Sequence, residues 1–238
     1  MKLYRGSRNQ EHKNARNRKA GAACALAGLC TCALFLVLAG CAGLRSMLAG
    51  SERASWFPLR MGNRWEYRLA STVEQNGRLD TTTVADYHHE IVGTRKLAGG
   101  QPAFVRVWTS NVTLRDSGIA DSSFSQAETT FFRSTPHWVY RYEALSSPPD
   151  SILALPPELD QKWRSGGLYY WVAAREDIVI GGRRYPDCWR LTMTEENSPN
   201  SSNAWFARGF GLVRLVTERS FGDRKLRTDY FLTGAAIK

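Results

Sequence analysis

The stretch RWEYRLASTVEQNG, residues 64–77, decides the fold class predicted for this chain. Its odd positions Trp65, Tyr67 and Leu69 are aromatic or apolar, whereas positions 64, 66 and 68 are charged. Side chains two residues apart share one face of a β-strand, so this alternation is typical of a strand with one buried face. Asn76-Gly77 then supplies the two positive φ angles of a tight hairpin turn. The stretch therefore predicts an antiparallel hairpin.

The same signals continue away from this stretch. Residues 79–90 return as a run rich in threonine and valine, and residues 225–232 alternate charged with apolar or threonine side chains after a Gly222-Asp223 turn. No window shows a sustained helical period, so the mature chain is predicted to be all-β and mostly antiparallel. A barrel and a sandwich both fit this pattern.

The residues before the strand favour packing over chemistry. Pro58 fixes its own φ and lacks an N–H donor, and Gly62 permits a tight turn. Trp65 and Tyr67 then begin the buried face, where one tryptophan can bury about 200 Å². Because none of these four residues is a nucleophile or a base, the segment is interpreted as a structural motif that starts a strand.

A weaker copy of this segment returns near residue 156. Three segments of the chain have a later counterpart in the same order: Pro58…Trp65 with Pro156…Trp163, Pro102…Val107 with Pro186…Leu191, and Phe131-Phe132 with Trp205-Phe206. The order predicts two tandem halves, residues 56–145 and 150–238, joined near the Ser/Pro-rich residues 146–151. Each half alone would be a small sheet short of core, so residues 56–238 are predicted to form a single β-rich domain.

The first 55 residues predict export and a lipid anchor. Residues 1–19 are basic, and residues 20–40 carry no charge, which together form a helical signal segment. Leu38-Ala39-Gly40-Cys41 resembles the bacterial lipobox, which implies cleavage between Gly40 and Cys41 and lipidation of the Cys41 thiol. Residues 41–55 would then be a short tether. The alternative is an uncleaved helix, since 21 uncharged residues can span a bilayer.

Charge and leader together predict the location. Residues 1–40 carry seven basic side chains and one glutamate, so the remaining chain holds only +4 of the +10 net charge. This mild excess argues against nucleic acid as a partner. An aspartate directly after the lipidated cysteine would resemble a signal that keeps a lipoprotein in the inner membrane. Residue 42 is alanine, which favours the outer membrane. We therefore expect a cell-envelope protein, anchored in the outer membrane and facing the periplasm.

Two motifs carry a resemblance to a known family. The pattern PLxxGxxWxY is present as Pro58-Leu59, Gly62, Trp65 and Tyr67, and the pattern WFAxGxGLV as residues 205–213 with Gly209 and Gly211. Together with the lipobox leader and Pro186-Asp187-Cys188, they resemble a family of uncharacterised exported bacterial lipoproteins. This family more often has proline where Arg208 stands. The resemblance implies a β-rich envelope protein and supplies no catalytic residues.

The sharpest polar cluster is Asp86, His88 and Glu90. These side chains share one face of the predicted strand, and two carboxylates with an imidazole can bind a divalent metal. Positions i, i+2 and i+4 spread over about 13 Å, however, which is wide for three ligands of one ion. A solvated strand face explains the same residues, so no metal and no cofactor are expected.

Other reactive side chains have simpler explanations. His137 follows a Thr-Pro turn signal, Glu195-Glu196 flank a polar loop, and Cys188 lies in an apolar run that predicts a small buried side chain. The chain has no G-x-S-x-G, P-loop, C-x-x-C or H-E-x-x-H motif. We therefore expect no enzyme activity, and a hydrolase is the least favoured function.

The aromatic content leaves two functions open. All eight tryptophans lie beyond the leader, and such density is typical either of a filled β-core or of a cavity lined with rings. The chain is predicted to be a non-catalytic binding or structural module, with envelope proteins as possible partners. The alternative is a carrier of a lipid or another apolar ligand in a β-barrel cavity.

Overall fold

The computed structural model describes residues 56–116, 119–196, 198 and 200–238. They belong to one compact unit that runs from Ser51 to Lys238. All regular secondary structure in these ranges is β-strand. None of the described segments is a helix long and apolar enough to cross a membrane.

Twelve strands form one antiparallel sheet. Their bounds are β1 Arg64–Gln75, β2 Arg78–Lys96, β3 Pro102–Asp116, β4 Ile119–Ser134, β5 Trp138–Tyr142, β6 Asp150–Ala154, β7 Lys162–Ser165, β8 Leu168–Ile180, β9 Arg183–Glu195, β10 Ser201–Ala207, β11 Gly211–Phe221 and β12 Arg224–Ala236. The predicted return strand after Asn76-Gly77 is β2. Both turn residues have positive φ, 54° and 74°, as the dipeptide predicted.

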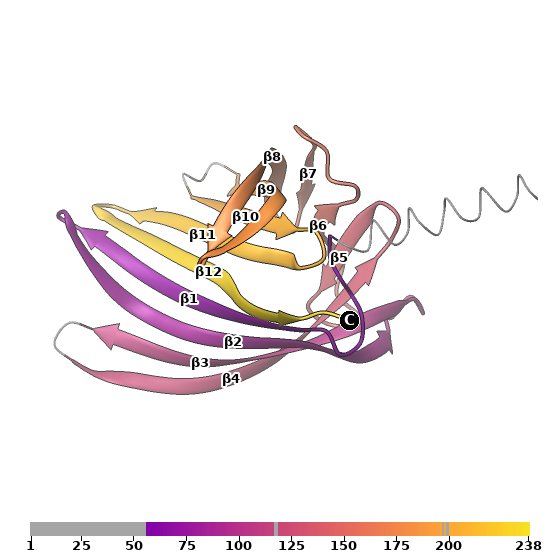
Figure 1. The fold of residues 1–238 in the computed structure, drawn as a ribbon, viewed down its shortest axis with the longest axis horizontal. Coiled ribbons are helices and arrows are strands. Elements are labelled where there is room, and N and C mark those ends of the chain that lie inside the picture. Colours follow the sequence, from indigo (N-terminus) through magenta and orange to yellow (C-terminus); the bar gives the residue numbers. More distant parts are fainter. Residues whose placement is uncertain (1–55, 117–118, 197, 199) are drawn as a thin grey trace, which may run out of the picture. The chain divides into compact units, whose positions relative to one another are not determined.

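The sheet curls into a nearly closed barrel (Figure 1). Strands that follow one another in the chain pair with each other, except β6 and β7, and β12 pairs with β1. The seam of the barrel therefore falls between β6 and β7, the two end strands of the sheet. At the seam, the indole of Trp163 donates a hydrogen bond to the carbonyl of Ser151 at 2.7 Å, and the Ser165 hydroxyl accepts one from the Ser151 amide at 2.7 Å. Side chains therefore close the barrel where the main-chain ladder stops.

Residues 56–63, the plug segment, cover one end of the barrel, with Trp56 and Asn63 buried and Arg60 and Met61 exposed. Trp56 is buried in the core, and the Phe57 ring lies 5.3 Å from Phe132 and 6.4 Å from Phe206. Asn63 is fully buried and bonds at both ends of its amide, to the Pro58 carbonyl and to the amide of Lys238, each at 2.9 Å. The plug segment thus fills the space that a barrel of this size would otherwise leave empty.

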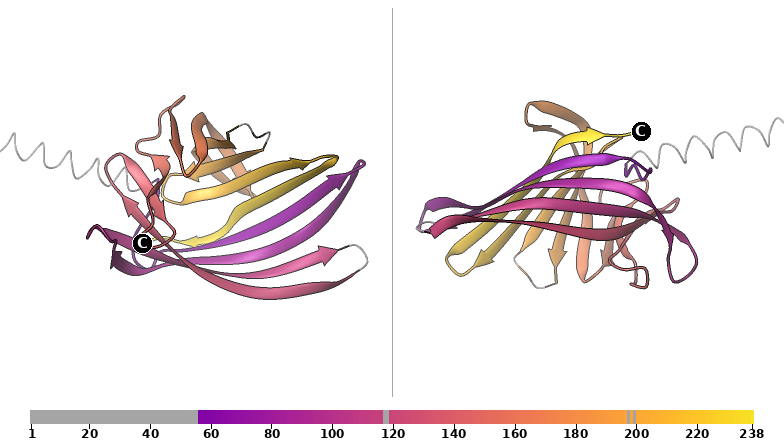
Figure 2. Two further views of the ribbon diagram at one scale, coloured as in Figure 1. Left: turned by 180° about the vertical axis from the view of Figure 1, so that it is seen from behind. Right: turned by 90° about the horizontal axis from the view of Figure 1, so that it is seen from below.

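The opposite end flares open. The long hairpins β1–β2 and β3–β4 extend past the short strands β5, β6 and β7, which reach only part of the way (Figures 1 and 2). β4 pairs with β5 only over residues 131–134, so its residues 119–130 form an open edge in the described sheet. The barrel is therefore open on one side above its filled end.

The prediction of an all-β antiparallel fold is confirmed, and the architecture is a barrel rather than a sandwich. The predicted signal segment lies outside the described residues. The tandem halves stay a prediction, although the three repeated segments do fall on strands six apart, namely β1 and β7, β3 and β9, and β4 and β10.

Candidate functional site: a groove on the concave face

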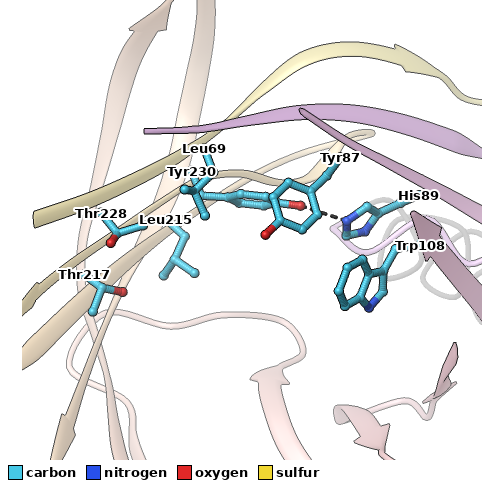
Figure 3. A pocket seen from close by; sticks show the side chains of 8 residues that line it. All are labelled: Leu69, Tyr87, His89, Trp108, Leu215, Thr217, Thr228 and Tyr230. Carbon is cyan, nitrogen blue, oxygen red and sulfur yellow. Dashed lines mark hydrogen bonds between the residues drawn. The ribbon is translucent and has the colours of Figure 1, made fainter. Parts of the chain in front are cut away.

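The concave face of the sheet holds a groove of about 200 Å³ next to the filled end. Strand register places its lining on one face: Leu69 pairs with Tyr230, Tyr230 with Leu215, and His89 with Trp108. We name this site the concave groove (Figure 3), and its lining residues are Leu69, Tyr87, His89, Trp108, Leu215, Thr217, Thr228 and Tyr230.

Aromatic rings form one wall of the concave groove. The Tyr87 ring lies 5.5 Å from Trp108 and 5.4 Å from Tyr230. Tyr230 in turn stacks on Tyr67, with 4.6 Å between the ring centroids. Rings in mutual contact at these separations hold one another in place. The wall is therefore preorganised and presents apolar faces to whatever enters.

Two polar groups of this wall, on Tyr230 and His89, are paired with each other. The Tyr230 hydroxyl and the His89 Nε2 atom are 2.9 Å apart and share a hydrogen bond (Figure 3). Burial, and then the charges of Arg106 and His88, lower the pKa of His89 to about 2. Burial also raises the pKa of Tyr230 above its ordinary value. Near pH 7 both groups are neutral, so the pair satisfies its own hydrogen bonds and is poorly suited to acid–base chemistry.

The apolar surface continues from the concave groove towards the open end. Val112 lies on the same face of β3 as Trp108, with the buried Ser110 between them, and it pairs with Ala85 of β2 and Phe124 of β4. Leu114 is 42% exposed and Phe124 is 47% exposed, although both lie on the concave face. Exposed apolar residues joined to an apolar groove are typical of a ligand site. They also border the open edge of β4.

Beneath the concave groove lies a smaller space of about 30 Å³. His89 lines both spaces, and Phe57 of the plug segment and Arg106 of β3 line the lower one. The Arg106 Nε atom donates a 3.2 Å hydrogen bond to the Thr130 hydroxyl, and the guanidinium carbon lies 4.4 Å from the Phe132 ring centroid. Burial lowers the pKa of Arg106, but a guanidinium stays charged in proteins.

The predicted polar cluster lies elsewhere, on the convex face. His88 contacts Glu66 on β1 at 2.6 Å and Glu90 at 3.9 Å, whereas Asp86 pairs in register with Arg68 and is exposed. In the described part of the chain, no three His, Cys, Asp or Glu side chains come together as metal ligands. The structure thus brings His88 and Glu90 together and leaves Asp86 apart from them.

The two family motifs meet inside the barrel. The Trp65 indole donates to the carbonyl of Phe210, and the Tyr67 hydroxyl donates to the carbonyl of Leu212, each at 2.8 Å. Gly211, at φ 80°, lies against Pro58, where a Cβ atom would come within 3.4 Å of the proline ring.

The remaining motif residues lie around this core. Gly62 and Gly209 also have positive φ angles, of 81° and 78°. The Trp205 indole donates to Glu176 at 2.8 Å, while Trp163 lies at the seam and Pro156 is exposed. Every indole and hydroxyl bond described for these motif residues ends on another part of the fold, which suits a role in packing.

The other reactive residues are also held in structure. Cys188 is buried in β9, and burial, followed by the charges of Asp177 and Asp187, raises the pKa of the Cys188 thiol to about 12. His137 lies in the turn between β4 and β5, and Glu195 ends β9. Gly40 and Cys41 lie outside the described residues, so cleavage and lipidation there stay predictions.

Sequence reasoning missed the residues of the concave groove. His89 was not singled out because the neighbouring His88, on the opposite face of the strand, had been assigned to the polar cluster. Trp108 and Tyr230 belong to runs that read equally well as filled core, since alternation shows which face is buried but not whether the space is filled. Arg106 lies in PAFVRVW, where no pattern marks an arginine that points inward.

No protein-family model matches the chain, and no curated protein matches its sequence. Among solved structures, the chain is similar to a protein from Bacteroides fragilis described as exported and YmcC-like in fold, at 11% identity and a TM-score of 0.44, over 76% of this chain and 98% of that one. A protein from Parabacteroides distasonis described as a lipoprotein matches at 11% identity and a TM-score of 0.36, over 76% and 98%. A LolA-superfamily protein from Nitrosomonas europaea matches at 10% identity and a TM-score of 0.21, over 81% and 93%.

Proposed function

We propose that this chain is a lipid-anchored cell-envelope protein that binds an apolar, chain-like ligand in the concave groove. The observation that carries the proposal is the aromatic groove together with Leu114 and Phe124, which are exposed on the same concave face beside an open sheet edge. A protein that needed these residues only as core would cover them.

The size of the groove supports a chain-like ligand. An engineered apolar cavity of about 150 Å³ accepts one benzene ring, so a groove of about 200 Å³ accepts a ring or a short length of alkyl chain. Sites for compact drug-sized ligands are larger, at about 300–1,000 Å³. A long, thin ligand lying partly in the groove and partly along Phe124 fits this surface better than a compact one.

The chemistry of the site supports binding rather than catalysis. The candidate base, His89, has a pKa of about 2 and is too weakly basic to take a proton near pH 7. The candidate nucleophile, Cys188, is a buried thiol with a pKa of about 12. Neither lies in an arrangement that would activate it.

The proposed location rests on the predicted leader, residues 1–40, and on the predicted lipidation of Cys41. Acyl chains on Cys41 would hold the barrel at a membrane through the tether, residues 41–55, and stable anchoring requires more than one chain. A barrel held beside a bilayer has lipids and their breakdown products within reach. This proposed location supports an envelope lipid, or a product of its breakdown, as the ligand.

Native mass spectrometry of the whole chain, purified from an envelope expression host, tests this function. We expect extra mass that disappears on denaturation. Replacing Trp108 with alanine removes one wall of the groove and should lower occupancy at least tenfold. The matched control is Trp171→Ala, because Trp171 lies on β8 outside the groove and is exposed.

A bare mass for the unaltered chain, or equal loss in both variants, would contradict the proposal. The second candidate function, an interaction module, would then be favoured. Its supporting observation is a group of exposed apolar side chains on and before β8, namely Leu159, Tyr169 and Trp171.

A further inference from the structure

Arg106 places a positive charge at the bottom of an apolar site. The residue lies on the concave face of β3, two positions from Trp108, and its side chain is partly buried. Among the described residues, no carboxylate comes within ion-pair distance of its guanidinium. Its hydrogen bond to Thr130 uses one of five N–H donors.

The other described groups around Arg106 form no ion pair with it. The phenols of Tyr67 and Tyr230 are uncharged near pH 7, because burial raises the pKa of each. Arg141 adds a second positive charge, and the carboxylate of Glu128, two residues from Thr130 on β4, acts on Arg106 only from beyond ion-pair distance and is exposed. A partly buried guanidinium with no carboxylate in ion-pair distance is suited to bind an anion, because it has further N–H donors for charge-assisted hydrogen bonds.

The space beside Arg106 is small and adjoins the concave groove. It measures about 30 Å³, which is the volume of about one water molecule. His89 lines both spaces, so they are neighbours, and a ligand with its tail in the groove would place its head beside Arg106 on the far side of His89. A planar carboxylate fits this space better than a bulky phosphate headgroup, and it matches the planar fork of a guanidinium.

We infer that Arg106 binds the carboxylate of the ligand, and that the ligand class is therefore long-chain carboxylic acids. This inference rests on the proposed function, since the concave groove holds the tail. It adds a polarity to the site: the charged head lies inward at Arg106, and the tail runs outward past Tyr87 and Trp108 towards Phe124.

The test measures retention of radiolabelled palmitate and methyl palmitate by the full chain immobilised on resin, with an empty resin as background. The two ligands share a tail and differ in charge. We expect palmitate to bind about 10- to 100-fold more tightly than its methyl ester, the range of a charge-assisted hydrogen-bonded pair. Equal binding of the two ligands would overturn the inference and leave the proposed function standing. Binding of neither would contradict the proposed function itself.

Two variants test whether Arg106 causes the tighter binding of palmitate. In Arg106→Gln, palmitate should bind as weakly as methyl palmitate, while methyl palmitate binding stays unchanged and shows that the barrel is folded. The control Arg95→Gln removes an exposed arginine of β2 and should leave both affinities unchanged.

A lysine variant and a competition experiment complete the test. If Arg106→Gln binds neither ligand, Arg106→Lys decides: a lysine variant that prefers palmitate supports the inference, and one without preference overturns it. Competition by palmitoyl lysophosphatidic acid separates the two anions. Weaker competition than palmitate supports the carboxylate, whereas equal or stronger competition overturns that assignment.

Discussion

At the scale of single residues, β4 offers a direct comparison of core and ligand surface. Phe132 and Phe124 both lie on its concave face, yet Phe132 is 1% exposed and Phe124 is 47% exposed. Phe132→Ala should lower the free energy of unfolding by about 3–5 kcal/mol, because it opens a cavity beneath the plug segment. Phe124→Ala should change it by less than about 0.5 kcal/mol. Urea denaturation of both variants checks this, and similar losses would contradict the division into core and groove.

His89 should make stability depend on pH. Its folded-state pKa of about 2 lies below the value of about 6.5 for a free histidine, so the unfolded chain takes up a proton that the folded chain does not. The stabilisation is fully present above pH 6.5 and is lost as the pH falls towards 2. Between pH 7 and pH 5, the free energy of unfolding should fall by about 2 kcal/mol from this residue.

Denaturation curves of two variants isolate the contribution of His89. His89→Gln keeps a hydrogen-bonding side chain beside Tyr230 but cannot titrate, so this part of the slope should vanish. His137→Gln, at an exposed turn, should keep this pH dependence of the free energy of unfolding. An unchanged slope in His89→Gln would show that His89 is not held neutral by burial.

What the sequence could predict at this scale was the buried face of each strand. Trp65 and Tyr67 were placed inward by alternation, and both are buried. Arg106 could not be found in this way, because apolar residues occupy both faces of β3 near its start. A second small cluster of Leu97, Ala103 and Tyr142 covers the convex face there. The residues on that face are therefore apolar too, and the alternation of polar and apolar residues that would mark the inward face is lost.

At the scale of elements, the seam between β6 and β7 is the weakest joint of the barrel. It depends on Trp163, whose indole bonds to Ser151 and whose ring stacks on Tyr170 at 5.1 Å. Trp163→Phe keeps an aromatic ring but leaves the Ser151 carbonyl without its donor, which should lower the free energy of unfolding by about 1–3 kcal/mol.

Hydrogen exchange locates this effect. Amide protection should fall first at Ser151 and across β6, while β1 and β12 stay protected, because those strands have ladder bonds on both sides. Trp171→Phe removes an exposed indole bond to Asp160 and serves as the matched control. Uniform loss of protection across all strands would contradict a local seam.

Hairpins were the elements that sequence predicted best. Asn76-Gly77 and Gly222-Asp223 were placed at turns, and strands β1, β2 and β12 follow from the patterns beside them. The open edge of β4 was beyond sequence reasoning, because it depends on how short β5 and β6 are relative to the strand beside them.

At the scale of the whole molecule, the strand order explains how one chain both fills and opens a barrel. Pairing of β12 with β1 brings the start and end of the described barrel together, so the plug segment lies at the filled end while the seam and open edge fall in the middle of the barrel sequence. Composition and pattern predicted an all-β chain with many aromatics. Whether those rings fill a core or line a cavity depends on the closure of the sheet, which no local pattern encodes.

The central claim is that the concave groove holds the tail of a ligand. The most direct measurement is a crystal structure of the protein grown with 9,10-dibromostearate, in which the bromine atoms are located by anomalous scattering. The account predicts bromine peaks on the concave face between Tyr87, Trp108 and Phe124. Bromine peaks only outside the barrel, or none in a crystal soaked to saturation, would contradict it.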